Sequence, residues 1–330
     1  MGIVALSRLL ALLAVTARRL GAALVLLIGA SFLIYITIRS APGDAVDAIT
    51  PMGTPPEIKA QLAAEFGLDV DPVTGYGAWL THSIVGDFGE SLVIRPGEEV
   101  MAMAAPRFAK SLLLGGSALF LCLALTMLLS ILMGEPTVRH QGLTGFLYFV
   151  TAAPSFVAAV FFTQGVNEFV RGVVEGSGYE TPPWYPIPIS TESVMPYFFA
   201  GIVLVIGDGL FMDMLNGIRA EILAVRNSQF IAAIRAKGAS TLPHIAKNLI
   251  VPAVSAYVSR LPLVLGGVVI VEYVFTLDGG GYMLLEASKQ RDFPVVVGLS
   301  VLFTASIIVL NLVADVIRTV VDPREVARGG

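Results

Sequence analysis

Charged side chains are scarce in this sequence. Only 14% of its 330 residues are Asp, Glu, Lys or Arg, whereas soluble domains carry about 25%. Apolar residues make up 55%, and the mean hydropathy is +0.80. A water-soluble chain of this length would need a charged surface over its core, so part of this surface must face lipid. The formal net charge of only −4 also argues against a nucleic acid as partner.

The sequence also lacks the residue patterns of a catalytic or metal centre. Cys122 is the only cysteine, which excludes an intrachain disulfide. The three histidines lie far apart, without the spacing of a metal site. Neither a G-x-x-x-x-G-K-[ST] loop nor a G-x-S-x-G elbow occurs, and Glu98 and Glu99 are better explained as a solvated turn than as a carboxylate pair. We therefore expect no catalytic residue, no metal site and no cofactor bound by this chain.

Long apolar segments are abundant instead. A spanning helix needs about 20 predominantly apolar residues. Six segments qualify: Leu20–Ile38, Ser111–Gly134, Leu143–Asn167, Ser193–Asn216, Asn248–Val271 and Val295–Ala314. Basic residues precede the first, as in a signal peptide, but Arg39 rather than a small-residue cleavage site follows it. The sequence therefore predicts an all-α integral membrane protein with six spans.

Two of these segments contain charges, namely Asp208 and Asp213 in the fourth and Arg260 in the fifth. Charges inside hydrocarbon are costly and usually face a bundle interior or a water-filled path. One interpretation is that they line a translocation path. A second is that Arg260 pairs with one of the aspartates and holds two spans together. A third is that Asp213 is solvated at the cytoplasmic end of its span.

The distribution of basic residues predicts the orientation. The N-terminus, residues 135–142, residues 217–247 and the C-terminal tail hold most of the Lys and Arg, whereas residues 40–108 carry ten acidic and three basic residues. Excess Lys and Arg marks the cytoplasmic side. Both termini are therefore predicted to be cytoplasmic.

The predicted spans divide the chain into three regions. Residues 1–39 comprise the N-terminus and span 1, residues 40–110 an extracytoplasmic cap region, and residues 111–330 a core with spans 2–6 and a cytoplasmic loop at about 217–251. Within the cap region, Thr54-Pro-Pro-Glu57 is a capping-box sequence and predicts a short helix that ends near Phe66. Residues 176–190, rich in Pro, Gly and aromatics, predict an ordered loop at the outer surface.

The loop at 217–251 has a distinctive pattern. Phe230–Lys237 predicts a short helix with small side chains and two cations near its end. Gly238 follows, where a helix C-cap favours glycine. Pro243 occupies the first turn of a second helix, where proline is tolerated. Two helices joined by a glycine form a compact bend that fits into a groove of another protein.

This stretch resembles the cytoplasmic coupling loop of binding-protein-dependent ABC importer permeases, whose pattern is E-A-A-x-x-x-G followed by an apolar run that ends in Pro. The chain has Ala232-Ala233-Ile234-x-x-x-Gly238 and then Leu249-Ile-Val-Pro252. The acidic first position of the pattern is Ala232 here. The Arg-Ala-Lys-Gly sequence at 235–238 is typical of the peptide branch.

Further blocks, in order along residues 20–325, are similar to the B-type permease of the dipeptide/oligopeptide family. They are Arg39-Ser-Ala-Pro-Gly-Asp44, Gly86-Asp-Phe-Gly-Glu-Ser91, Glu272-Tyr-Val-Phe275, Gly279-Gly-Gly281, Arg291-Asp-Phe-Pro-Val295 and Asp322-Pro-Arg324. One departure is Asp278, where the family has proline before the glycines.

The resemblance implies a six-span importer permease in the bacterial inner membrane that forms half of a translocation pathway. Its partners would be a second, C-type permease, two ATPases that bind ATP and Mg, an extracytoplasmic binding protein and membrane lipid. Ala232, Ala233, Arg235, Lys237 and Gly238 would couple to an ATPase. The outer gate or cap would involve a second set of residues, namely Arg39, Asp44, Glu272, Gly279 and Gly281.

The same resemblance leaves the solute open among peptides, metal chelates and oligosaccharides, with peptides the leading class. Two other classes of protein fit the sequence less well. A secondary transporter would show internal repeats around a broken-helix site, and the sequence has no evident repeat. A membrane-embedded enzyme would need a catalytic constellation. Neither class requires the bend at Gly238, which the importer subunit explains.

Overall fold

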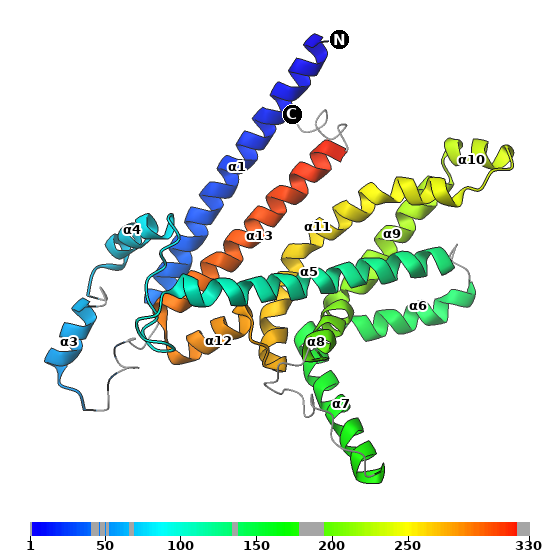
Figure 1. Ribbon diagram of the computed structural model, residues 1–330. Coiled ribbons are helices and arrows are strands. Elements are labelled where there is room, and N and C mark those ends of the chain that lie inside the picture. Colours follow the sequence, from blue (N-terminus) through cyan, green and yellow to red (C-terminus); the bar gives the residue numbers. More distant parts are fainter. Residues whose placement is uncertain are drawn as a thin grey trace. The chain divides into compact units, whose positions relative to one another are not determined.

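In the computed structural model of the chain, helices are the only regular elements of the part that it describes, which comprises residues 2–40, 46, 50, 53–65, 69–133, 138–177 and 195–321 (Figure 1). The helices, in chain order, are α1 (Gly2–Arg39), α3 (Pro56–Glu65), α4 (Pro72–Ser83), α5 (Val100–Met133), α6 (Val138–Thr151), α7 (Ser155–Ser177), α8 (Met195–Ile206), the 3₁₀ turn η1 (Gly207–Gly209), α9 (Leu210–Arg226), α10 (Gln229–Ala236), α11 (Leu242–Phe275), α12 (Gly280–Gln290) and α13 (Phe293–Val321). Within the described ranges, the only β pairing is an isolated bridge between Glu90 and Glu99.

Five stretches are long and apolar enough to cross a membrane, and the bent pair α6–α7 makes a sixth if it counts as one span. The all-α membrane architecture predicted from the sequence is therefore confirmed. The third predicted span, Leu143–Asn167, is not one continuous helix. It consists of parts of α6 and α7, which meet at an angle of 96°.

Pro154 explains this break. Proline has no backbone N–H and disfavours the helical conformation of the residue before it. The chain leaves the helix after Thr151 and starts again at Ser155. The carbonyl of Pro154 then accepts the N–H of Ala158 at 3.0 Å in the first turn of α7.

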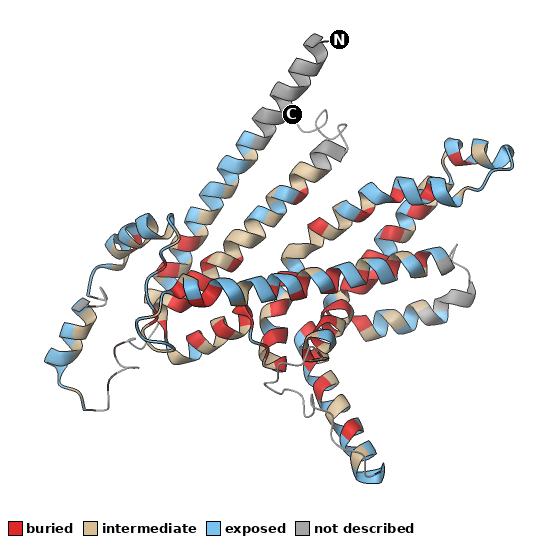
Figure 2. Ribbon diagram, in the orientation of Figure 1, coloured by how far each residue is buried: buried red, intermediate tan, exposed pale blue. Residues whose placement is uncertain are grey.

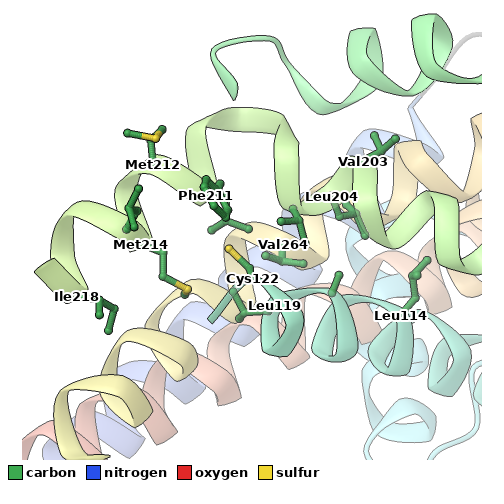
Figure 3. Packing of buried hydrophobic residues seen from close by; sticks show 14 of the residues in the cluster. Leu114, Leu119, Cys122, Val203, Leu204, Phe211, Met212, Met214, Ile218 and Val264 are labelled. Carbon is green, nitrogen blue, oxygen red and sulfur yellow. The ribbon is translucent and has the colours of Figure 1, made fainter. Parts of the chain in front are cut away.

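The chain forms two compact units, each described by itself. The first, which we call the outer unit, comprises residues 1–111 and 278–312, and the second, the core unit, comprises residues 112–277 and 313–330. The core unit buries one apolar cluster supplied by α5 and α7–α11. Figure 3 shows Leu119 and Cys122 of α5 facing Leu204, Phe211 and Val264 within it.

The helices differ in how far this packing covers them. From Ala17 to Arg39, α1 is mostly exposed or half-buried, whereas α8 and α9 carry many buried residues (Figure 2). Only 11% of the apolar window of α1 is buried, against 61% for the window that covers α8 and α9. The surface of α1 is therefore left for lipid or for another chain.

In the outer unit, aromatic side chains of α1 and α4 pack together with Phe88 and Phe293. The helix predicted in the cap region is confirmed as α3, with its first residue at Pro56. Several predicted features lie outside the described residues: Asp44, Phe66 at the expected end of the cap helix, most of the loop 176–190, and Asp322-Pro-Arg324.

Candidate functional site

The segment predicted to contact a partner forms as the sequence indicates. The side chain of Ser228 caps α10 by accepting the N–H of Ile231 at 3.4 Å. Lys237 ends the helix, and Gly238 follows with φ +71°, a left-handed conformation that favours glycine. The next helix, α11, has Pro243 in its first turn. In Figure 1, α10 lies at the end of the pair formed by α9 and α11.

The two faces of α10 differ sharply. Ile231 is fully buried in the apolar cluster of the core unit, and Ile234 packs against that cluster. The residues predicted to couple to an ATPase are all exposed, namely Ala232, Ala233, Arg235, Lys237 and Gly238. One face thus anchors α10, and the other leaves small and cationic side chains uncovered.

A groove of about 780 Å³ adjoins this exposed face. It is lined by Ala224, Val225, Ser228, Phe230, His244, Lys247 and Asn248. The rings of Phe230 and His244 pack edge to face, with their centroids 5.7 Å apart, and this contact joins α10 to the first turn of α11. The groove therefore has an apolar ring at its wall and a cation, Lys247, at its rim.

Asp208 lies where two interrupted helices meet. It has φ +57° between Gly207 and Gly209, so the helical path breaks between α8 and α9. Its backbone N–H donates to the carbonyl of Ala153 at 3.0 Å, and its carboxylate accepts the N–H of Ser155 at 3.0 Å. Asp208 therefore caps α7, whose N-terminus carries unpaired N–H groups and a positive dipole.

Glycines make this crossing possible. A Cβ on Gly207 would lie 2.6 Å from the Cα of Ser155, which no real structure tolerates without a shift. On α11, a Cβ on Gly267 would lie 3.3 Å from Leu204 and 3.6 Å from the hydroxyl of Ser155. Three interrupted or glycine-bearing elements therefore approach one another at Ser155.

The pairing interpretation for Arg260 is not supported. Throughout the described part of the chain, no ion pair joins Arg260 to Asp208 or Asp213. Asp208 instead contacts Ser155, and Asp213 lies exposed on the first turn of α9. The structure thus brings Asp208 to a helix crossing but does not bring the three charges together.

The predicted outer residues fall into separate places. Arg39 ends α1, donates to the carbonyl of Val70 at 3.3 Å and lies 5.5 Å from the ring centre of Phe293. It thereby braces the segment before α4, although its predicted companion Asp44 is outside the described residues. Glu272, in the last turn of α11, is fully buried.

Gly279 and Gly281 lie at the start of α12. The connection is tight, because Thr276 ends α11 with φ +52° and Gly280 follows within four residues. The N–H of Gly280 donates to the hydroxyl of Ser111 at 2.8 Å. A Cβ on Gly280 would lie 3.1 Å from the Cα of Phe108. The glycines therefore allow α12 to begin directly against the backbone of α5.

Asp278 strengthens the same junction. Its carboxylate accepts from Arg107 at 2.6 Å and from Lys110 at 2.7 Å. Burial by itself raises the pKa of this carboxyl, but the two hydrogen bonds and cationic charges outweigh it and hold the pKa below its ordinary value. The residue that departs from the family pattern is therefore an ion-paired clamp between α12 and α5.

Sequence reasoning missed the role of Asp292. This fully buried carboxylate accepts from the hydroxyl of Ser91 at 2.5 Å and from the backbone N–H groups of Leu92, Val93 and Ile94 at 3.0–3.2 Å. It ties the loop before α5 to the start of α13. The only signal in the sequence was its place in the Arg291-Asp-Phe-Pro-Val block, which does not indicate a partner 200 residues earlier.

Comparison with known families adds independent evidence. The sequence profile of the family described as "Binding-protein-dependent transport system inner membrane component" matches residues 126–326, well over half of the chain. The matched range includes the crossing at Asp208, all of α10 and the buried Glu272. It begins after the first part of α5, so α1, α3 and α4 lie outside it.

Several curated proteins are similar over nearly the whole length. The oligopeptide transport system permease protein AppB of Bacillus subtilis is 26% identical over 91% of this chain and 95% of its own length. A candidate peptide permease protein of Brucella ovis is 28% identical over 91% of this chain and 94% of its own. The metal-staphylopine import system permease protein CntB of Staphylococcus aureus is 26% identical over the same shares. These relatives differ in the solutes that their names give.

Proposed function

We propose that this chain, which belongs to the family of binding-protein-dependent transport system inner membrane components, forms half of a pathway that imports peptides at the expense of ATP. The proposal rests on how α10 is held and exposed. Its inner face is anchored by Ile231, and its outer face is exposed next to a groove of about 780 Å³. An isolated membrane bundle has no need of such a segment, whereas a chain driven by a separate ATPase does.

The partners follow from this role. A second, C-type permease would complete the pathway, two cytoplasmic ATPases would bind ATP and Mg, and an extracytoplasmic binding protein would deliver the solute. The chain itself would then bind no nucleotide. Both termini and α10 would lie in the cytoplasm of the cell, in keeping with the excess of Lys and Arg in those segments.

Peptides are the proposed solute because two of the similar proteins carry peptide transport in their names. Import of a metal chelate is the second candidate, since a relative of comparable identity is named for metal-staphylopine import. An oligosaccharide importer would work by the same mechanism.

The route of coupling would run along α9. Movement of α10 by an ATPase would pass through α9 to the crossing at Asp208, and from there to the N-terminus of α7. Such a two-state change requires packed elements with discrete arrangements. Asp208, Asp213 and Arg260 would face the translocation path, with Asp208 at its hinge. At the outer side, Arg39, Asp44, Glu272, Gly279 and Gly281 would shape the gate.

Gly238 offers the sharpest test of coupling. In Gly238→Val, the left-handed backbone would cost about 1–2 kcal/mol, and a branched side chain would intrude into the docking face. In vesicles that hold the complete importer, uptake should be lost while the chain stays folded. ATP hydrolysis should no longer respond to the loaded binding protein.

Gly97→Val is the matched control, because Gly97 is also left-handed (φ +81°) with open space around it, but lies in the outer unit. The control should lower stability by a similar amount and leave coupling intact. Equal loss of uptake in both variants would mean that the defect is one of folding, and normal coupling in Gly238→Val would refute the docking role.

The solute and the partners are tested together by gentle extraction of the tagged chain and mass spectrometry of what accompanies it. A second permease, ATPases and a binding protein with trapped peptide would support the proposal. Recovery of this chain alone from crosslinked native membranes would favour a secondary transporter instead.

A further inference from the structure

We propose that α4 and the turn after it, residues 70–86, lie within the lipid leaflet that surrounds the Arg39 end of α1, with Val73, Ile84 and Val85 against hydrocarbon. This inference rests on the membrane-spanning character of α1 and not on the solute or the ATPase. It concerns a region that would otherwise be assigned to an aqueous cap.

The depth of α4 is fixed by its contacts with α1. The hydroxyl of Tyr76 donates to the carbonyl of Ile28 at 3.1 Å and lies 2.9 Å from the hydroxyl of Ser31. The apolar window of α1 runs from Ala17 to Arg39, so Ile28 is about 16 Å from its end at a rise of 1.5 Å per residue. The Tyr76 hydroxyl therefore reaches the middle of the apolar window, about half of a hydrocarbon layer that is about 30 Å thick.

The backbone of α4 follows this side chain inward. A Cβ on Gly75 would lie 2.8 Å from the hydroxyl of Tyr35, so the tip of that side chain rests against the backbone of α4 where Gly75 has no side chain. The ring of Trp79 lies 5.6 Å from the ring of Tyr35. At the other end, the contact of Arg39 with the carbonyl of Val70 marks the level where the segment enters from the polar side. In Figure 1, α4 lies beside the Arg39 end of α1.

The composition of α4 agrees with this depth. Among its twelve residues none is Asp, Glu, Lys or Arg, although His82 is present, and Asp71 stands just before the first turn as its cap. The neighbouring helix α3 carries Glu57, Lys59 and Glu65 within ten residues. Of the two short helices in this connecting region, α4 therefore has the composition of a lipid-exposed helix and α3 that of a water-exposed one.

The free face of the segment carries three large apolar side chains, and Thr74, Thr81 and His82 are exposed beside them. The exposed fractions are 60% for Val73, 76% for Ile84 and 80% for Val85. The last two are adjacent, at a turn that Gly86 closes with φ +88°. The exposed pair His82–Asp87, 3.4 Å apart, gives the segment a polar side that would face the headgroups.

Lipid is the occupant that the surroundings indicate. The exposed face of the adjacent α1 is also apolar, with Leu24, Val25 and Leu33 uncovered. Because the Tyr76 contacts hold α4 against α1, lipid that covers this face of α1 would also reach the apolar side chains of α4. Half-buried aromatic residues such as Trp79 are typical of the boundary between hydrocarbon and headgroups.

Collision accessibility of a spin label tests the proposal. A nitroxide is attached to Val85→Cys, Ile84→Cys or Val73→Cys in a Cys122→Ala background, and the full chain is placed in vesicles of phosphatidylethanolamine and phosphatidylglycerol. Oxygen, which concentrates in hydrocarbon, should collide with these labels far more often than the water-soluble complex Ni-EDDA. The ratio of the two rates should be several-fold higher than at Ile58→Cys on α3 and close to that at Leu33→Cys on α1.

Two results would overturn the proposal. A ratio equal to that at Ile58→Cys would place the turn in water, as a surface free for a binding protein. Low accessibility to both reagents would mean that protein covers the turn, whether a second copy in vesicles or another subunit when the measurement is repeated on the complex that co-purifies. If the labels still collide preferentially with oxygen, both in vesicles and in the co-purified complex, the proposal is supported.

Discussion

The outer unit and the core unit are stabilised by different kinds of contact. In the outer unit, buried or clamped carboxylates organise the connections: Asp292 accepts four hydrogen bonds, and Asp278 joins two cations. In the core unit, long helices pack through one apolar cluster, and polar contacts such as that of Asp208 occur where helices break.

This difference has a physical reason. Loops expose backbone N–H groups that must find partners when they are buried, and a carboxylate satisfies several at once. Helices satisfy their own backbone, so apolar side chains suffice to pack them. Directional polar contacts specify one arrangement, whereas apolar contacts between helices tolerate sliding. The outer unit is thus suited to be rigid, and the core unit to change shape.

Removing the carboxylate of Asp292 should destabilise the outer unit strongly, and this is the largest effect that we predict. In Asp292→Ala, the N–H groups of residues 92–94 and the hydroxyl of Ser91 would lose their acceptor. An unsatisfied buried donor costs about 1–3 kcal/mol, and since these losses overlap we expect about 3–5 kcal/mol in all. The thermal midpoint of the purified chain should fall by about 10 °C. Asp69→Ala, at an exposed position, should leave it unchanged; an equal midpoint for both variants would contradict the assigned role.

Overpacking the crossing should have the next largest effect. In Gly207→Ala, the new methyl group would meet the backbone of Ser155, and we expect a loss of about 1–3 kcal/mol. Uptake should fall as well, because α7 and α9 would be pushed apart. Gly201→Ala, in the preceding helix α8, is the control, since a Cβ there meets nothing within 4 Å and should stabilise α8 by up to about 1 kcal/mol. Stability is measured by thermal unfolding, and uptake is measured by transport in vesicles.

Neutralising Asp278 should have the smallest effect. Its carboxylate is 57% exposed, so the clamp should contribute less than about 1 kcal/mol. Because folding lowers its pKa, this stability is present above the ordinary value of 3.8 and is lost as the pH falls through the folded pKa. Asp278→Asn should therefore be slightly less stable than the natural chain at pH 7, and the two should converge below about pH 4. A difference that grew on acidification would contradict the clamp.

The fold of α10 was predictable because its signals are local. Small residues, a glycine at the helix end and a proline in the next first turn all lie between Ala232 and Pro243. The Asp208 crossing was only half visible. A charge in an apolar run indicated an unusual position, but the break there and Ser155 as the partner depend on how two distant segments fold.

Taken alone, the sequence determined that this chain is helical, that it spans a membrane and that it resembles an importer permease, since hydrophobic length and short motifs are properties of neighbouring residues. The tertiary structure alone decided that Asp292 binds a loop 200 residues away, that Arg260 pairs with neither Asp208 nor Asp213, and that α4 reaches the middle of the apolar window of α1. These outcomes depend on which backbone groups remain unsatisfied when separate helices meet, and no local pattern records that.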